Sequence, residues 1–246
     1  VQTCALPISV TTVGTWTAWA PNAVNHNGDT LSWGVPNTQG GQQSSLVITN
    51  PGVQNIQTYT GLNPPQVAPY LANSVALTHN NFVLQGGSPT LTSATLSVAM
   101  TVQATNPAGS SQPLQTINYK IKFVETTNTA GTCAAASPPG NPCNDIFVLL
   151  DDPLLNETFN YGGQAYFVNA FPLAGNVLST LPDPVCGAAN VANGCTGFTT
   201  IENQSNALPW GLTISTNPLQ VPEPGSLALI GLALAGAGLI SRRRSA

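Results

Sequence analysis

The stretches 96-LSVAMTV-102 and 117-INYKIKF-123 alternate apolar residues with polar or small ones along their whole length. A period of two is the spacing of a β-strand that buries one face. Residues 106–113 between them are rich in Pro, Gly and Ser, as a connecting loop would be. The sequence therefore predicts an antiparallel hairpin, with Lys120 and Lys122 on its outer face.

Further strands are expected wherever short apolar runs are bounded by turn residues. These runs are residues 14–19, 45–49, 74–79, 146–150, 165–171, 198–202 and 211–215. We expect no helix before the C-terminal tail and find no internal repeat. The pattern predicts an all-β chain, with an antiparallel β-sandwich or jelly roll over residues 11–216 and one C-terminal transmembrane helix after it.

Charged residues are scarce in this chain. Of 246 residues, 42% are hydrophobic and only 6% are charged, with five Lys and Arg against nine Asp and Glu. The hydrophobic fraction is sufficient for a core, which argues against a disordered polyelectrolyte. Removing everything after Gln220 takes away three Arg and Glu223, so the net charge of −4 becomes −6 for the body. An acidic body lacks the basic surface that nucleic-acid binding needs, and we expect no nucleic-acid partner.

The C-terminal tail has three parts in a fixed order. Pro222, Glu223 and Pro224 come first, residues 225–240 then carry no charge, and a basic run ends the tail. As a helix, the uncharged span would reach roughly 24 Å at ~1.5 Å per residue, close to the thickness of a bilayer core. Arg242, Arg243 and Arg244 would hold its end on the cytoplasmic side and leave the body outside. A buried core helix is the alternative, but this span has no polar face.

These three parts together resemble the PEP-CTERM sorting signal of Gram-negative bacteria that make exopolysaccharide, which we assign to residues 217–246. The resemblance implies export, initial anchoring in the inner membrane through the C-terminal helix, and recognition of Pro222, Glu223 and Pro224 by an exosortase. Two prolines suit that recognition, because they keep the segment extended and accessible.

The first eight residues have a separate explanation. Val-Gln-Thr-Cys-Ala-Leu-Pro-Ile is the in-frame translation of a common sequencing adaptor, and the chain begins with Val1 and not with Met. We expect residues 1–8 to be an assembly artefact that replaced an upstream signal peptide. Cys4 is then not part of the natural chain.

Four cysteines remain, an even number in an exported chain. They are Cys133, Cys143, Cys186 and Cys195. Three connectivities are possible, and we favour pairing within each close pair, which would close two short loops. A zinc site is the alternative, but the chain has no CxxC and neither histidine is near these cysteines in sequence.

The motif Leu77-Thr-His-Asn-Asn-Phe82 resembles the THxN family of PEP-CTERM proteins, through Thr78, His79 and Asn81. Residues 33–36, 43–46 and 195–202 fit the same resemblance, which implies no activity. His79 could be read as a catalytic base or a metal ligand. The structural interpretation is favoured, in which Thr and Asn stabilise a turn and the imidazole ties that turn to an adjacent strand.

Oxygen ligands for calcium are concentrated in one stretch of the sequence. The stretch contains Asn144, Asp145, Asp151, Asp152, Asn156 and Glu157, and its candidate ligands are Asp145, Asp151 and Asp152. Asp151 and Glu157 could also form the carboxylate pair of a glycosidase. Neither spacing matches a known motif, and Asp151-Asp152-Pro153 is an ordinary turn sequence.

The expected function is a structural or adhesive one at the cell surface or in the exopolysaccharide matrix, as in a biofilm or floc. The alternative is a lectin-like module, assisted by calcium, that stacks sugars on Trp16, Trp19, Trp33 or Trp210. An enzyme acting on extracellular polysaccharide is third, because the chain has no GxSxG, HExxH, GxGxxG or phosphate-loop motif. We expect no catalytic residues and no obligatory cofactor.

Overall fold

The protein is mostly antiparallel β-sheet, as the sequence predicts. A computed structural model describes residues 5–150, 156–173 and 178–219. The strands in these ranges are β1 (Pro7–Ala20), β2 (Asn25–Asn27), β3 (Thr30–Trp33), β4 (Ser44–Thr49), β5 (Val53–Gln57), β6 (Leu71–Asn73), β7 (Ala76–Asn81), β8 (Ser93–Ala104), β9 (Gln112–Pro113), β10 (Ile117–Val124), β11 (Asp145–Leu149), β12 (Glu157–Tyr161), β13 (Gln164–Pro172), β14 (Ser179–Thr180), β15 (Thr196–Thr200), β16 (Gln204–Leu208) and β17 (Trp210–Ser215).

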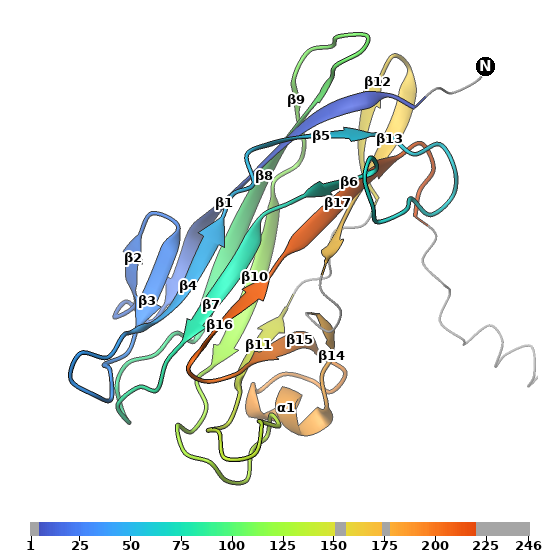
Figure 1. The fold of residues 1–246 in the computed structure, drawn as a ribbon. Coiled ribbons are helices and arrows are strands. Elements are labelled where there is room, and N and C mark those ends of the chain that lie inside the picture. Colours follow the sequence, from blue (N-terminus) through green and yellow to red (C-terminus); the bar gives the residue numbers. More distant parts are fainter. Residues whose placement is uncertain (1–4, 151–155, 174–177, 220–246) are drawn as a thin grey trace, which may run out of the picture.

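The strands form three sheets (Figure 1). The largest has eight strands, in the order β14-β15-β11-β10-β8-β1-β5, with β9 paired to β8. A five-stranded sheet has the order β16-β7-β4-β3-β2, and a four-stranded sheet has the order β12-β13-β17-β6.

The predicted hairpin lies at the centre of the largest sheet. β8 pairs antiparallel with β10, from Ile117 opposite Val98 to Lys122 opposite Ser93. Tyr119, Ile121 and Phe123 are buried, and the two lysines lie on the other face of β10. Part of the predicted loop pairs as well, because β9 returns onto β8.

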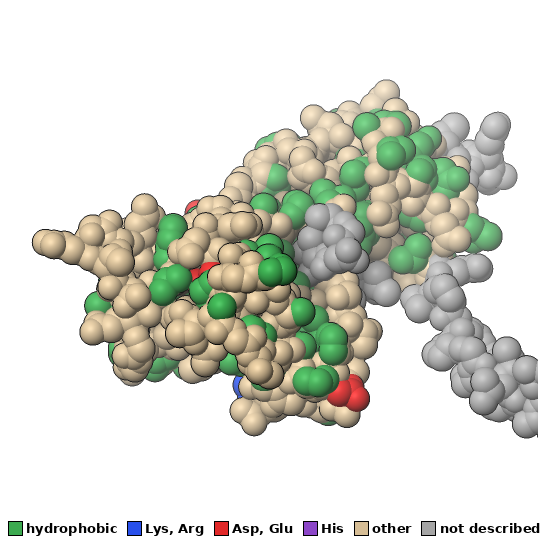
Figure 2. Space-filling view, turned by 60° about the horizontal axis from the view of Figure 1, so that its bottom comes forward, with side chains coloured by type: hydrophobic (Ala, Val, Ile, Leu, Met, Phe, Trp, Pro, Cys, Tyr) green, Lys and Arg blue, Asp and Glu red, His purple; other side chains and the backbone are tan. Residues whose placement is uncertain are grey.

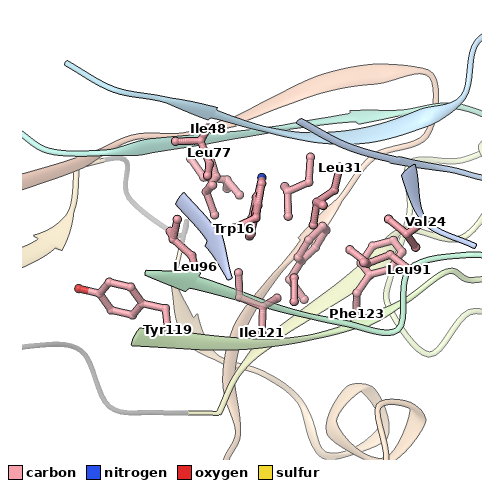
Figure 3. Close-up of a cluster of buried hydrophobic side chains, with 14 of the residues drawn as sticks. Trp16, Val24, Leu31, Ile48, Leu77, Leu91, Leu96, Tyr119, Ile121 and Phe123 are labelled. Atoms are coloured by element: carbon pink, nitrogen blue, oxygen red, sulfur yellow. The ribbon is translucent and has the colours of Figure 1, made fainter. Parts of the chain in front are cut away.

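One face of the large sheet packs against the five-stranded sheet. In Figure 3, side chains from both layers point toward one another around Trp16, Leu31 and Ile121. Fully buried members of this cluster include Trp33, Leu46 and Phe147. This is the larger core of the molecule, and it ends beside the loops that follow β10 and β15.

The same face of β1 and β8 continues into a second core. Ile8, Val10, Met100 and Val102 extend the buried rows of these strands and pack against the four-stranded sheet. Two residues of the stretch assigned to the adaptor, Pro7 and Ile8, belong to β1. The long β1–β8 ladder therefore joins both cores.

A short helix, α1 (Asp183–Ala188), lies against the opposite face of the large sheet. The expectation of no helix before the tail is therefore wrong. A proline in the first turn fixes a helical φ, and Asp183 places negative charge near the helix N-terminus. Val185 and Cys186 are buried against Ile146 and Val148 of β11.

Both favoured disulfides are present. Cys133 is bonded to Cys143 in the loop between β10 and β11, and Cys186 is bonded to Cys195 between α1 and β15. In the described ranges, no helix is long and apolar enough to cross a membrane. The expected transmembrane span, residues 225–240, lies outside the described residues.

Candidate functional site

Three acidic side chains meet inside the protein. Glu125, Asp145 and Glu202 each place a carboxylate oxygen within 4.8 Å of the others, and we call this group the carboxyl cluster. Asp145 and Glu202 are buried and Glu125 is half-buried. The described residues include only six acidic side chains, so half of them gather at this one point.

Antiparallel pairing brings the three residues together from distant parts of the sequence. Glu125 directly follows β10, Asp145 opens β11, and Glu202 lies two residues beyond β15. Val124 pairs with Ile146, and Asp145 pairs with Thr200. The end of β10, the start of β11 and the end of β15 therefore share one edge of the large sheet.

Neighbouring groups hold two of these carboxyls in place. The backbone N–H of Thr126 donates to Asp145 Oδ1 at 2.8 Å. The Thr126 hydroxyl donates to the Cys143 carbonyl oxygen at 2.8 Å and lies 3.2 Å from the same Asp145 oxygen. The indole Nε1–H of Trp33 donates to Glu125 Oε2 at 3.2 Å. The Cys133–Cys143 disulfide closes the loop that joins Glu125 to Asp145, so this loop has little freedom to separate them.

A tight turn positions Glu202. The Asn206 side chain accepts a hydrogen bond from the Ile201 N–H at 3.2 Å and donates to the Ile201 carbonyl oxygen at 3.1 Å. Asn203 in this turn has a φ of 59°, a left-handed conformation that Asn tolerates well. The turn directs Glu202 inward, and only 2% of its surface is exposed.

Burial makes the charged form of all three carboxyls unfavourable. It raises the pKa of Glu202 to about 7, and the nearby Asn81 amide opposes that rise. Burial also raises the pKa of Glu125 and of Asp145, and each rises further because the other carboxyls of the cluster are close. The two lysines of the described chain lie on the outer face of β10, away from the cluster.

Several buried oxygens at this point have no hydrogen-bond donor. Within the described residues, Glu125 Oε1, Asp145 Oδ2, both Glu202 oxygens and Asn81 Oδ1 form no hydrogen bond. Buried polar atoms are nearly always paired, because an unpaired one costs about 1–3 kcal/mol. Five unpaired acceptors at one place indicate that the site accepts protons or a cation.

The Thr78-His79-Asn80-Asn81 motif lies beside the carboxyl cluster. The expected turn is wrong, because all four residues belong to β7. Residues 78–81 are therefore extended, with His79 and Asn81 on the buried face of the strand.

His79 connects the two facing sheets. Its Nδ1 lies 2.9 Å from Thr200 Oγ1 on β15, and its ring stacks on Trp33 at 5.5 Å. Burial lowers the pKa of His79 to about 3, so the ring is neutral at physiological pH. The imidazole ties its strand to another, as the structural interpretation requires, although that strand belongs to the facing sheet.

The calcium ligands that the sequence predicted do not form one described group. Asp145 belongs to the carboxyl cluster, while Asp151 and Asp152 lie outside the described residues. Glu157 lies in β12, in a different sheet from the cluster. Sequence reasoning missed Glu125 and Glu202, although each lies at or just beyond the end of a predicted strand.

The four tryptophans differ in burial. Trp16 and Trp33 are 5% and 0% exposed, so they are core residues and cannot stack on a sugar. Trp19 is half-buried, with its ring centroid 4.4 Å from that of His26. Trp210 is half-buried and lines a small, mostly apolar cavity.

A polar cleft leads from solvent to Glu125. Its walls come from the loops after β7 and β10, and the lining residues include Gln85, Ser88, Thr126 and Asn128. Glu125 also lines this cleft, although its unpaired Oε1 is buried, so the cleft lies next to the carboxyl cluster.

A family model described as the PEP-CTERM protein-sorting motif matches residues 220–244. The match includes Pro222, Glu223, Pro224 and the three terminal arginines, all outside the described residues. Comparison with the curated proteins gives no match for this chain. The matched motif indicates a protein exported toward the cell surface and processed by an exosortase.

Proposed function

We propose that this chain is a structural or adhesive protein of the cell surface or the exopolysaccharide matrix. After export it is held in the inner membrane by its C-terminal helix, and an exosortase then releases it by processing near Pro222, Glu223 and Pro224. The body is a disulfide-supported β-sandwich of the THxN family. The observation that carries this proposal is the sorting motif at residues 220–244.

The composition of the body supports a matrix role. Figure 2 shows a face with few charged side chains and much uncharged polar surface. Two disulfides and two β-sheet cores suit a chain that persists outside the cell. Such a surface can hydrogen-bond to neutral polysaccharide without strong charge repulsion.

Cell fractionation tests the sorting step. A tagged full chain carrying Pro222→Ala and Pro224→Ala is expected to accumulate in the membrane fraction, while the unmodified chain reaches the surface and the matrix. Pro218→Ala, an exposed proline outside the matched motif, is the matched control. Equal distribution of the motif variant and the control would refute exosortase processing at this site.

Binding to native exopolysaccharide separates the matrix role from the lectin-like alternative. Trp19, whose ring packs against that of His26, is the tryptophan used to test this alternative. Saturable glycan binding that Trp19→Ala abolishes would favour the lectin-like module, whereas its absence leaves the matrix role. Release of reducing ends that falls on replacing Glu157 would instead indicate the third candidate, a polysaccharide-cleaving enzyme.

A further inference from the structure

We propose that the carboxyl cluster, together with the side-chain oxygen of Asn81, binds one Ca²⁺ ion. The site joins the loops after β10 and β15 with the end of β7. It is independent of the sorting motif and of the proposed matrix role, and of the calcium ligands that the sequence predicted it contains only Asp145.

The geometry of the cluster suits Ca²⁺. Calcium binds oxygen ligands at about 2.3–2.6 Å, so two oxygens on opposite sides of one ion are about 4.6–5.2 Å apart. One oxygen from each of the three carboxyls lies within 4.8 Å of the others. Mg²⁺ needs shorter distances of about 2.0–2.1 Å and a strict octahedral shell.

Asn81 provides an observation that is separate from the acidic residues. Its side chain is fully buried, it lies beside Glu202, and its Oδ1 has no hydrogen-bond partner in the described residues. The Asn81 Nδ2 donates to the Thr200 carbonyl oxygen at 3.4 Å, and the same amide lies close enough to Glu202 to lower its pKa, so Asn81 faces both Thr200 and Glu202. A neutral amide oxygen beside carboxylates is a common component of calcium sites.

The need to neutralise the buried carboxylates also favours a bound cation. Buried carboxylates cost several kcal/mol each unless a cation or a proton neutralises them. The two lysines of the described chain lie on the other face of β10. A divalent ion would neutralise most of the charge and would occupy the unpaired oxygens at the same time.

The surrounding structure fits a binding site that is largely formed in advance. Trp33 and Thr126 each satisfy one carboxylate oxygen and leave the second free. The disulfide between Cys133 and Cys143 restrains the loop that carries two of the acids. The polar cleft lined by Glu125 places solvent next to the cluster.

Thermal unfolding of the purified full chain, with both disulfides formed, tests the proposal. After EDTA treatment and dialysis, CaCl₂ at one hundred times Kd is expected to raise Tm by about 5–10 °C. NaCl of equal ionic strength is expected to leave Tm unchanged. A calcium shift no larger than the NaCl shift would overturn the proposal.

Variants connect the calcium shift to these residues. Glu202→Gln and Asp145→Asn are expected to remove the shift, and Glu157→Gln, which changes an acid in another sheet, is expected to keep it. If one cluster variant fails to fold, the other still gives the result. A full calcium shift in either folded variant would refute the site.

Terbium luminescence gives a second measurement that does not depend on stability. Tb³⁺ occupies calcium sites and is excited by a nearby indole, and the Trp33 indole already contacts Glu125 at 3.2 Å. We expect emission that saturates at one Tb³⁺ per chain, is displaced by Ca²⁺ and is lost in Glu202→Gln. Unchanged emission in that variant would place the ion elsewhere and refute the proposal.

Discussion

Replacing Glu202 by glutamine removes one ionisable group from the carboxyl cluster with little change of shape. Burial raises the pKa of Glu202 from 4.5 to about 7. A carboxyl whose pKa is raised by folding stabilises the protein below pH 4.5, and this stabilisation is lost as the pH rises through 7. Without calcium, Glu202 therefore contributes less and less to the stability of the unmodified protein as the pH rises from 4 to 8, and the variant lacks this contribution.

The size of the effect follows from the two pKa values. Each pH unit between 4.5 and 7 corresponds to ~1.4 kcal/mol, which gives up to about 3 kcal/mol for the whole interval. The partly open cleft beside Glu125 lets water screen the cluster, so about 2 kcal/mol is the expected change. Between pH 4 and pH 8, the free energy of unfolding of Glu202→Gln is thus expected to rise by about 2 kcal/mol relative to that of the unmodified chain.

Urea unfolding in EDTA, at pH 4 and at pH 8, measures this difference. Groups outside the cluster titrate alike in both proteins, so their contributions cancel when the two free energies of unfolding are subtracted. Glu125 and Asp145 lose the charge of Glu202 in the variant, which lowers their pKa values and changes the difference in the same direction. Glu157→Gln controls for the loss of a carboxylate away from the cluster. The reasoning is refuted if Glu202→Gln has the same effect at both pH values, or if it is more destabilising at pH 8.

Three further predictions concern other parts of the structure. Burial lowers the pKa of His79 from 6.5 to about 3, so His79 stabilises the fold above pH 6.5 and this contribution is lost as the pH falls. In urea unfolding, the free energy of unfolding of His79→Gln should therefore rise relative to that of the unmodified chain by ~1.4 kcal/mol for each pH unit between pH 6 and pH 4. Replacing Cys186 and Cys195 by serine should cost about 2.7 kcal/mol, since their disulfide closes a nine-residue separation, and a loss below 1 kcal/mol in chemical unfolding would contradict this. Gly197→Ala should lower Tm strongly, because the new Cβ meets a backbone carbonyl of β11, whereas Gly187→Ala meets nothing and should change Tm little.

The longer strands were predictable because they either alternate buried with more exposed residues, as β8 and β10 do, or are mostly apolar and buried, as β11 is. Alternation over residues 96–102 and 117–123 corresponds to β8 and β10, and 211–215 corresponds to β17. β16, Gln204–Leu208, has few apolar residues and gave no such signal, because it packs only Leu208 into the core. Short strands were missed as well, because β3, Thr30–Trp33, places Leu31 and Trp33 in the core but is only four residues long.

The carboxyl cluster was not predictable from periodicity, because its three acids are far apart in the sequence. The missing information was strand order: β10, β11 and β15 are neighbours. An antiparallel order of these strands puts Glu125, Asp145 and Glu202 at one edge of the sheet. Acidic residues at the ends of three predicted strands were the available signal, but they become informative only once the pairing is known.

The long β1–β8 ladder also sets how far the carboxyl cluster stands from the chain ends. Tyr59 forms a bridge with Ser215, and the Leu6 N–H donates to Thr58, so the first and last described strands meet at one end (Figure 1). β8 runs from Ala104 at that end to Ser93, which pairs with Lys122 just before Glu125. At ~3.4 Å per residue, its twelve residues span about 37 Å. The carboxyl cluster is therefore buried near the end of the molecule that is farthest from where the first and last described strands meet.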